Sequence, residues 1–290
     1  MTSRKVVELF YDVVSPYTWL GFEVICRYRT VWNIDLKLRP AFLSGVMQGS
    51  GNKPPGVVPN KFKYMSKDLT RLREYFDVPL NFPSDPFHVM FEKGSLSAMR
   101  FITAVQESEK GGDKYVEQVS RELWRRIWSE DKDITEPASL CEAALKAGLS
   151  DSEIKEILEL SKSKEVKDKL KSNTQAALDY GVSAPLIWTN QAHYSSVIKL
   201  KSVFPQAFGF PLLVCHVNGK QESFFGSDRF ELMAHCIGEK STLCSASATN
   251  TQSEITLVYN ISCSFLRLTF FSASGEKWLG PQPEKSAAKL

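Results

Sequence analysis

The first 42 residues predict a strand, a helix and a second strand in succession, and this order constrains the fold more than any other feature. Residues 6–11 (VVELFY) are apolar and β-prone, as in a buried strand. Large apolar residues then recur at helical spacing from Trp19 to Trp32, and residues 35–42 (DLKLRPAF) alternate like a second strand. A strand–helix–strand unit of this length implies a right-handed crossover between parallel neighbours. The chain is therefore expected to be an α/β protein.

The middle of the chain is predicted to be helical. Between Lys61 and Tyr180, apolar residues at three- and four-residue spacing predict helices over residues 93–108, 114–128, 136–147 and 150–160. Ser150 and Ser172 each begin a segment with the spacing of a capping box, which predicts helix starts there.

Strands return after this helical block. Residues 210–217 and 220–225 predict a hairpin, because Asn218-Gly219 between them favours a two-residue turn. A helix is expected to open at residues 226–229 and to run through His235. This order predicts a thioredoxin-like domain with an inserted all-helical domain.

Composition excludes several classes of function. The net charge is only +3, and no Lys/Arg cluster alternates with aromatic residues, so nucleic-acid binding is not expected. None of the six cysteines forms a C-x-x-C pair and the four histidines lack ligand spacing, so we expect neither a metal site nor a reactive disulfide. The apolar stretch from Ile255 to Ser274 contains Arg267, whose insertion would cost about 2.5–3.5 kcal/mol, and we expect no membrane span.

Ser15 lies where the first strand ends and the first helix begins, followed directly by Pro16. Serine before proline is typical of a helix N-cap, and local sequence alone favours that simple role. A helix N-terminus also favours anions through its free N–H groups and its dipole, so the same hydroxyl is placed to stabilise a thiolate.

Six separated motifs share the order found in one known family: SPYTWLGFE, SGNKPPG, KGSLSAMRF, RELWRRIWSEDKDITEP, FGFP and FFGSDRFELMAHCIGEK. Together they resemble the kappa-class glutathione transferases, which are related to the Dsb disulfide oxidoreductases and to bacterial 2-hydroxychromene-2-carboxylate isomerases. In the Dsb relatives a C-x-x-C cysteine stands at the helix start, where this chain has Ser15 and Thr18. The resemblance implies an enzyme that conjugates the glutathione thiolate to small hydrophobic electrophiles, with glutathione as substrate and no cofactor.

The same resemblance implies a set of site residues. Ser15 would be catalytic, and Pro211 would be a cis-proline whose predecessor, Phe210, pairs through its backbone with the cysteinyl part of glutathione. The residues expected to bind glutathione are Ser15, Pro16, Tyr17, Asn52, Phe210, Pro211, Ser227 and Asp228. The helical block would supply an apolar wall for the electrophile.

Two segments do not fit the family pattern. Residues 182–206 separate YG from AFGFP, and residues 241–277 begin and end at a GEK triplet. Our hypothesis is that the first is a translated intron, since Val-Ser can be encoded by a donor-like hexamer; genuine surface insertions remain the alternative. The expected domains are a discontinuous thioredoxin-like domain (1–60 and 207–285) and a helical domain (61–181).

Two alternative functions remain open. One is a glutathione-dependent isomerase of the 2-hydroxychromene-2-carboxylate type, and another is an inactive isoform that only binds glutathione. The resemblance also implies a homodimer. The last three residues, Ala288-Lys289-Leu290, resemble a peroxisomal address, with the mitochondrial matrix as the alternative.

Overall fold

The computed structural model describes residues 4–108, 112–180 and 207–240. Both segments expected to be insertions, 182–206 and 241–277, lie outside these residues, and so does the terminal tripeptide.

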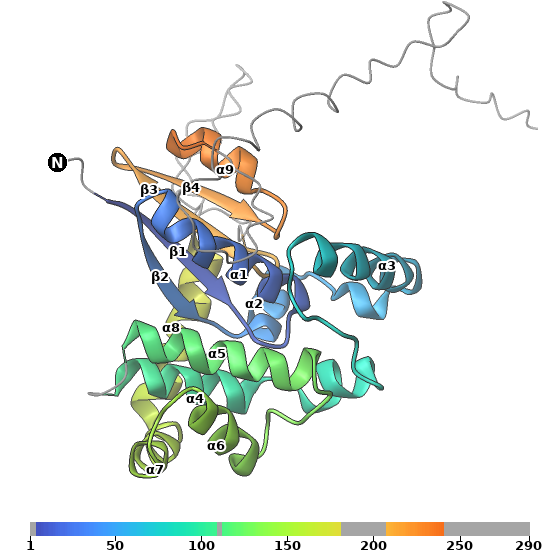
Figure 1. The fold of residues 1–290 in the computed structure, drawn as a ribbon, viewed down its shortest axis with the longest axis vertical. Helices are drawn as coiled ribbons and strands as arrows, with labels where there is room; N and C mark the ends of the chain where they lie inside the picture. Colours follow the sequence, from blue (N-terminus) through green and yellow to red (C-terminus); the bar gives the residue numbers. More distant parts are fainter. Residues whose placement is uncertain (1–3, 109–111, 181–206, 241–290) are drawn as a thin grey trace, which may run out of the picture. The chain divides into compact units, whose positions relative to one another are not determined.

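A four-stranded mixed sheet of order β2-β1-β3-β4 organises the fold (Figure 1). Strand β1 (Lys5–Tyr11) pairs in parallel with β2 (Ile34–Pro40) through the crossover helix α1 (Pro16–Val31), as the sequence predicts. Strands β3 (Leu212–Val217) and β4 (Lys220–Phe225) form the expected hairpin, and β3 lies antiparallel to β1. Asn218 and Gly219 both have positive φ, as a two-residue hairpin turn requires.

The helices expected in the middle of the chain are present between β2 and β3, with boundaries that differ from those expected by a few residues. The block follows the short helix α2 (Leu43–Ser50) and the turn η1 (Pro55–Val57). It contains α3 (Pro59–Tyr75), η2 (His88–Lys93), α4 (Leu96–Glu107), α5 (Asp113–Trp128), α6 (Pro137–Lys146), α7 (Asp151–Leu160) and α8 (Lys164–Asp179). Helix α9 (Phe230–Ile237) follows the hairpin, and α4 to α7 gather at the opposite end (Figure 1). The inserted helical block of the sequence prediction is therefore confirmed.

One of the two expected capping boxes is wrong. Ser150 caps α7 and forms a complete box with Glu153. Ser172 lies inside α8, which begins at Lys164 because its N-cap, Ser163, accepts a hydrogen bond from the backbone N–H of Val166. Spacing alone cannot separate a cap from the interior of a helix, because the pattern of serine and Gln/Glu three residues later occurs in both.

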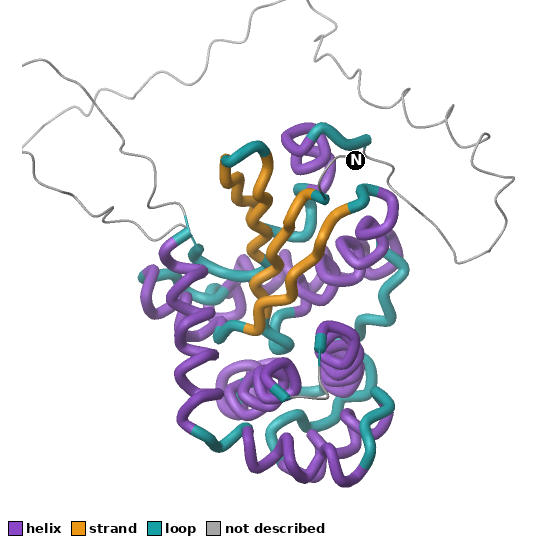
Figure 2. Tube along the Cα trace, turned by 90° about the vertical axis from the view of Figure 1, so that its left-hand side faces the viewer, coloured by secondary structure: helices purple, strands orange, loops and turns teal. Residues whose placement is uncertain are grey.

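Both faces of the sheet carry helices, as Figure 2 shows. Val7, Leu9 and Tyr11 of β1 face a large core shared with α1, α9 and the helical block. The opposite face holds a smaller cluster in which Phe10 packs with Ala207, Phe210 and residues of α2 and α8. This second cluster anchors the chain on either side of residues 181–206, since Tyr180 and Ala207 both belong to it.

None of the helices within the described ranges is long and apolar enough to cross a membrane.

Candidate functional site

A cavity of about 700 Å³ opens at the carboxyl end of β1, where α1 begins. Its walls come from α1, α2, η1, α3, η2, the loop before β3 and the segment after β4. All eight residues expected to bind glutathione line it: Ser15, Pro16, Tyr17, Asn52, Phe210, Pro211, Ser227 and Asp228. Tertiary structure thus brings together four segments that lie up to about 200 residues apart in the chain.

Ser15 is the N-cap of α1, with an extended backbone, and its hydroxyl oxygen accepts a hydrogen bond from the Thr18 N–H at 3.2 Å. Because a hydroxyl has one hydrogen to donate, this bond leaves the Ser15 O–H available to a ligand. The backbone around it is held firmly: the Ser15 N–H donates to the Asp12 carbonyl at 3.1 Å, and the indole of Trp124 donates to the Ser15 carbonyl at 3.2 Å. The serine is both a cap and an oriented donor.

Asp12, three residues before Ser15, is fully buried and was not identified from the sequence. Its carboxylate accepts hydrogen bonds from the Val14 N–H (3.0 Å), the Leu43 N–H (2.9 Å) and the Ser95 hydroxyl (2.9 Å). It therefore joins the Ser15 turn to the first residue of α2 and to the residue preceding α4. Burial raises the pKa of Asp12 to about 6, against the opposing effect of these three bonds. An acidic residue at the end of an apolar strand was the only sequence signal.

The Phe210–Pro211 peptide bond is cis, as expected. Phe210 is buried, yet within the described part of the chain neither its N–H nor its C=O makes a hydrogen bond. Buried backbone groups are almost always paired, so this loop offers a donor and an acceptor to an extended peptide ligand. Gly21 of α1 lets the loop approach closely, because a Cβ there would lie 3.0 Å from Pro211 Cγ.

Asn52 connects two loops of the cavity wall. Its Nδ2 donates to the Phe208 carbonyl at 2.6 Å, and its Oδ1 accepts from the Lys53 N–H at 2.8 Å. The asparagine therefore holds the SGNKPPG loop against the segment that leads to the cis-proline. One N–H of its side-chain amide has no partner among the residues the structure describes.

Ser227 and Asp228 line the cavity, but the expected helix start at residues 226–229 is wrong. Helix α9 begins at Phe230, and its N-cap, Arg229, makes no side-chain capping bond. Gly226 has a φ of 101°, and a Cβ there would lie 2.7 Å from Asp228 Oδ1, so only glycine allows the carboxylate to fold back over this turn. Ser227 is buried and Asp228 is exposed at the mouth.

The helical block forms the apolar half of the cavity. The sequence predicted this apolar wall but not the residues that form it. Helix α3 contributes Tyr64, Met65 and Leu72, and η2 contributes Met90 and Phe91. Methionine and aromatic side chains adapt to apolar ligands of varied shape. The α3 residues recur at helical spacing and were recognisable as one stripe, whereas the approach of η2 depends on tertiary packing.

Asp68 interrupts this apolar stripe on α3. Its Oδ2 accepts a hydrogen bond from the Tyr17 hydroxyl at 2.9 Å, which links the first turn of α1 to the helical block. Burial raises the pKa of Tyr17, and so do the bond to Asp68 and the nearby negative charges of Asp68 and Asp228. Tyr17 is therefore a neutral phenol whose hydrogen is committed to Asp68.

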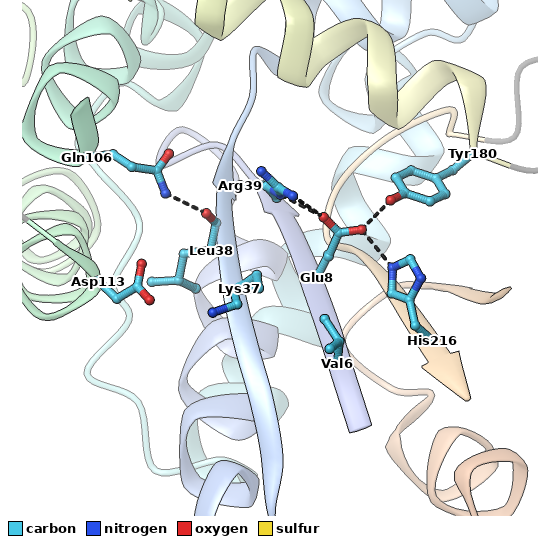
Figure 3. Close-up of a pocket in the computed structure, with 9 residues that line it drawn as sticks. All are labelled: Val6, Glu8, Lys37, Leu38, Arg39, Gln106, Asp113, Tyr180 and His216. Carbon is cyan, nitrogen blue, oxygen red and sulfur yellow. Dashed lines mark hydrogen bonds and ion pairs between the residues drawn. The ribbon is translucent and has the colours of Figure 1, made fainter. Parts of the chain in front are cut away.

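A second hollow, of about 540 Å³, lies beside Glu8 of β1 and shares no lining residue with the first (Figure 3). At its centre the buried carboxylate of Glu8 binds Arg39 at 2.6–2.7 Å, the His216 Nε2 at 2.8 Å and the hydroxyl of Tyr180. Burial alone would raise the pKa of Glu8, but hydrogen bonds from Tyr180, His216 and Arg39 together hold it below its usual value. This carboxylate is fully satisfied by the protein itself, so we assign it a structural role.

The part of the chain that the structure describes contains neither a disulfide nor a metal-binding cluster. Its four cysteines (Cys26, Cys141, Cys215 and Cys236) are free thiols, and none of them lines the larger cavity. No group of three or more His, Cys, Asp or Glu residues in these ranges is arranged to hold a metal ion.

Residues 6–187 match the model of the DSBA-like thioredoxin domain family. The sequence is 48% identical over 236 residues to glutathione S-transferase kappa 1 from Homo sapiens, an alignment that covers 81% of this chain and 92% of the human protein. It is 46% identical over 236 residues to glutathione S-transferase kappa 1 from Rattus norvegicus, with the same coverage. A solved structure of 2-hydroxychromene-2-carboxylate isomerase superposes with a TM-score of 0.57 at 16% identity over 80% of this chain and 94% of that one, a likeness of fold alone.

Proposed function

The chain belongs to the DsbA-like thioredoxin family and, within it, to the kappa class of glutathione transferases, and from this premise we infer how its larger cavity works. The protein is a glutathione transferase: glutathione binds across the polar half of the cavity and its sulfur lies against the N-terminus of α1. The observation that carries this placement is the Ser15 hydroxyl, whose oxygen is occupied by the Thr18 N–H and whose hydrogen remains to be donated.

Ser15 stabilises the reactive form of the substrate. A cysteine-like thiol titrates near pH 8.5 and is mostly protonated at neutral pH. The donated O–H of Ser15 and the dipole of α1 both favour the thiolate, which lowers the pKa of the bound thiol. The thiolate sulfur then attacks the carbon of an electrophile that carries a leaving group. A carbon–sulfur bond forms, the bond to the leaving group breaks, and that group departs with the electron pair.

The remaining polar groups position the peptide. Phe210 pairs through its N–H and C=O with the cysteinyl unit, next to the cis-proline. Ser227 and Asp228 bind the γ-glutamyl end, and Asn52 binds the peptide from the opposite wall with its remaining amide N–H. The apolar half holds the electrophile next to the sulfur, so that the two reactants meet at high effective concentration.

The test combines retention on immobilised glutathione with turnover of an aryl halide activated by nitro groups. We expect Ser15→Ala to be retained but to lose about 10–150-fold in kcat/KM, the value of one hydrogen bond to a charged group. The bound thiol should also titrate at higher pH, as followed by thiolate absorbance. Ser66→Ala removes a hydroxyl from α3 that donates to the Phe62 carbonyl, and serves as the control.

Each other outcome has a definite meaning. An unchanged rate in Ser15→Ala would refute the role of Ser15 in stabilising the thiolate. Failure of the unmodified protein to bind immobilised glutathione would refute the placement of glutathione. Retention of the unmodified protein without turnover would identify a form that only binds glutathione.

Two further expectations stay predictions. We propose a homodimer, which sedimentation velocity would test. We also propose delivery to the peroxisome through Ala288-Lys289-Leu290, with the mitochondrial matrix as the alternative. A fluorescent fusion with and without these three residues tests this, and diffuse signal from the intact form would contradict it.

A further inference from the structure

The charge of the cavity defines the class of electrophile. Resting on the proposed function, we propose that the site takes uncharged or cationic electrophiles and that the carboxylate of Asp68 excludes those that carry an anionic group. This names the second substrate by its charge, and it assigns Asp68 as the residue that determines the selection.

The charged side chains around the cavity are all acidic. Its charged lining residues are Asp68 and Asp228, and no lysine, arginine or histidine lines it within the described ranges. The lysines next to lining residues in the sequence, Lys53, Lys63 and Lys67, are exposed and lie outside the lining set. Asp68 has no cationic partner in the ion pairs of the described residues, and its Oδ2 is bound only by the neutral phenol of Tyr17. An anion in the apolar half therefore meets an uncompensated carboxylate.

The α3 and proline walls of that half present few backbone donors to an anion. Anions are commonly bound at helix N-termini, where N–H groups are free. The polar half has such a terminus at α1, beside Ser15. The α3 residues of the apolar half begin at Tyr64, beyond the first turn of the helix, where N–H groups are used within it. Pro54 and Pro55 of the adjoining wall have no N–H at all.

The reaction itself adds a second repulsion. The bound sulfur is negative when it attacks, so an electrophile with a carboxylate would be repelled both by the thiolate and by Asp68. Two unit charges about 6 Å apart repel each other by about 1–3 kcal/mol at effective dielectric constants between 20 and 40, which corresponds to a tenfold to hundredfold loss in rate. A neutral aryl or alkyl electrophile has no such penalty and packs against methionine and aromatic side chains.

This selection also separates the two enzymatic functions left open by the sequence. The substrate named in 2-hydroxychromene-2-carboxylate isomerase carries a carboxylate, and the cavity described here has an acidic side chain in its apolar half. The charge of the site therefore favours transfer to neutral electrophiles over isomerisation of that anion.

The experiment compares a chlorodinitrobenzoate with its methyl ester, both conjugated by the full-length protein with glutathione. Each kcat/KM is divided by the uncatalysed rate constant with glutathione, which removes the difference in intrinsic reactivity. We expect the unmodified protein to prefer the ester by at least about tenfold. Asp68→Asn keeps an oxygen to accept the Tyr17 hydrogen bond while removing the charge, and should reduce that preference about tenfold.

Asp77→Asn is the matched control, since it removes the same charge just beyond the end of α3 but lies outside the cavity lining. Asp77 has a φ of 50°, a conformation that asparagine also adopts, so this variant should fold normally and keep the full preference for the ester. Equal use of the acid and the ester by the unmodified protein would overturn the inference, as would an unchanged preference in Asp68→Asn. Failure to conjugate either compound would instead contradict the proposed function on which the inference rests.

Discussion

Asp12 is the residue whose burial is hardest to explain by packing alone. A carboxylate without a cationic partner is expensive to bury, and here it is compensated only by two backbone N–H groups and one hydroxyl. These donors belong to the Ser15 turn, to α2 and to the start of α4. The carboxylate thus holds the Ser15 turn in place at the expense of stability, a common feature of functional sites.

Asp12→Asn should change how stability depends on pH. The pKa of Asp12 rises from 3.8 to about 6 on folding, so the folded state binds the proton more tightly and loses stability as pH rises between these values. Two units correspond to about 3 kcal/mol. The difference in unfolding free energy between variant and unmodified protein should therefore shift by about 3 kcal/mol in favour of the variant from pH 3 to pH 7.

Urea denaturation at several pH values measures this difference. A difference that stays constant across the range would show that Asp12 does not titrate as its burial implies.

At the scale of elements, Glu8 joins three strands and a helix. It lies on β1 and binds Arg39 of β2, His216 of β3 and Tyr180 at the end of α8 (Figure 3). The Tyr180 ring also packs edge-on against Phe10, in the cluster that contains Phe210. The Glu8 carboxylate therefore links the sheet to the apolar cluster that contains Phe210 of the cis-proline loop.

Glu8→Gln should destabilise the protein by about 1–3 kcal/mol at neutral pH, because hydrogen bonds to a charged acceptor become weaker or are lost. The pKa of Glu8 is lowered in the folded state, so its contribution is present above the usual value of 4.5 and is lost as pH falls through the folded pKa. The effect of the substitution should accordingly shrink in acid, as seen in thermal unfolding at pH 7 and below pH 4.

Glu159→Gln removes an exposed ion pair with Lys162 and should cost less than about 1 kcal/mol, which makes it the control. Equal losses in the two variants would refute the structural role of Glu8.

At the scale of the whole molecule, the fold should tolerate removal of residues 182–206. Tyr180 and Ala207 pack in the same apolar cluster on the sheet, so the two ends are held by the described part of the chain. Lengthening a loop adds only a slowly growing entropic cost, so its removal should change stability by no more than about 1–2 kcal/mol. Circular dichroism, thermal unfolding and retention on glutathione measure the result. A deletion variant that fails to fold would show that this segment is part of the structure.

Much of the fold was determined by the sequence alone, because strands, helices and the hairpin turn depend on local patterns. The apolar strand at residues 6–11, the capping box at Ser150 and the turn at Asn218-Gly219 are each encoded within a few residues. Where a local pattern is ambiguous the prediction fails: Ser172 has the spacing of a cap but lies within α8, and α9 begins after Asp228. The family resemblance supplied the identity of the site residues, since no local rule distinguishes Ser15 from an ordinary cap.

Only the tertiary structure decided how these residues act together. It places the Ser15 hydroxyl, the unpaired backbone of Phe210 and the α3 stripe around one cavity. It also buries Asp12 against the backbone of Val14 and Leu43, which line that cavity, and places Asp68 in its wall with no cationic partner among the described residues. Burial, charge compensation and the approach of distant segments are properties of packing between elements, and the order of residues along the chain does not specify them locally.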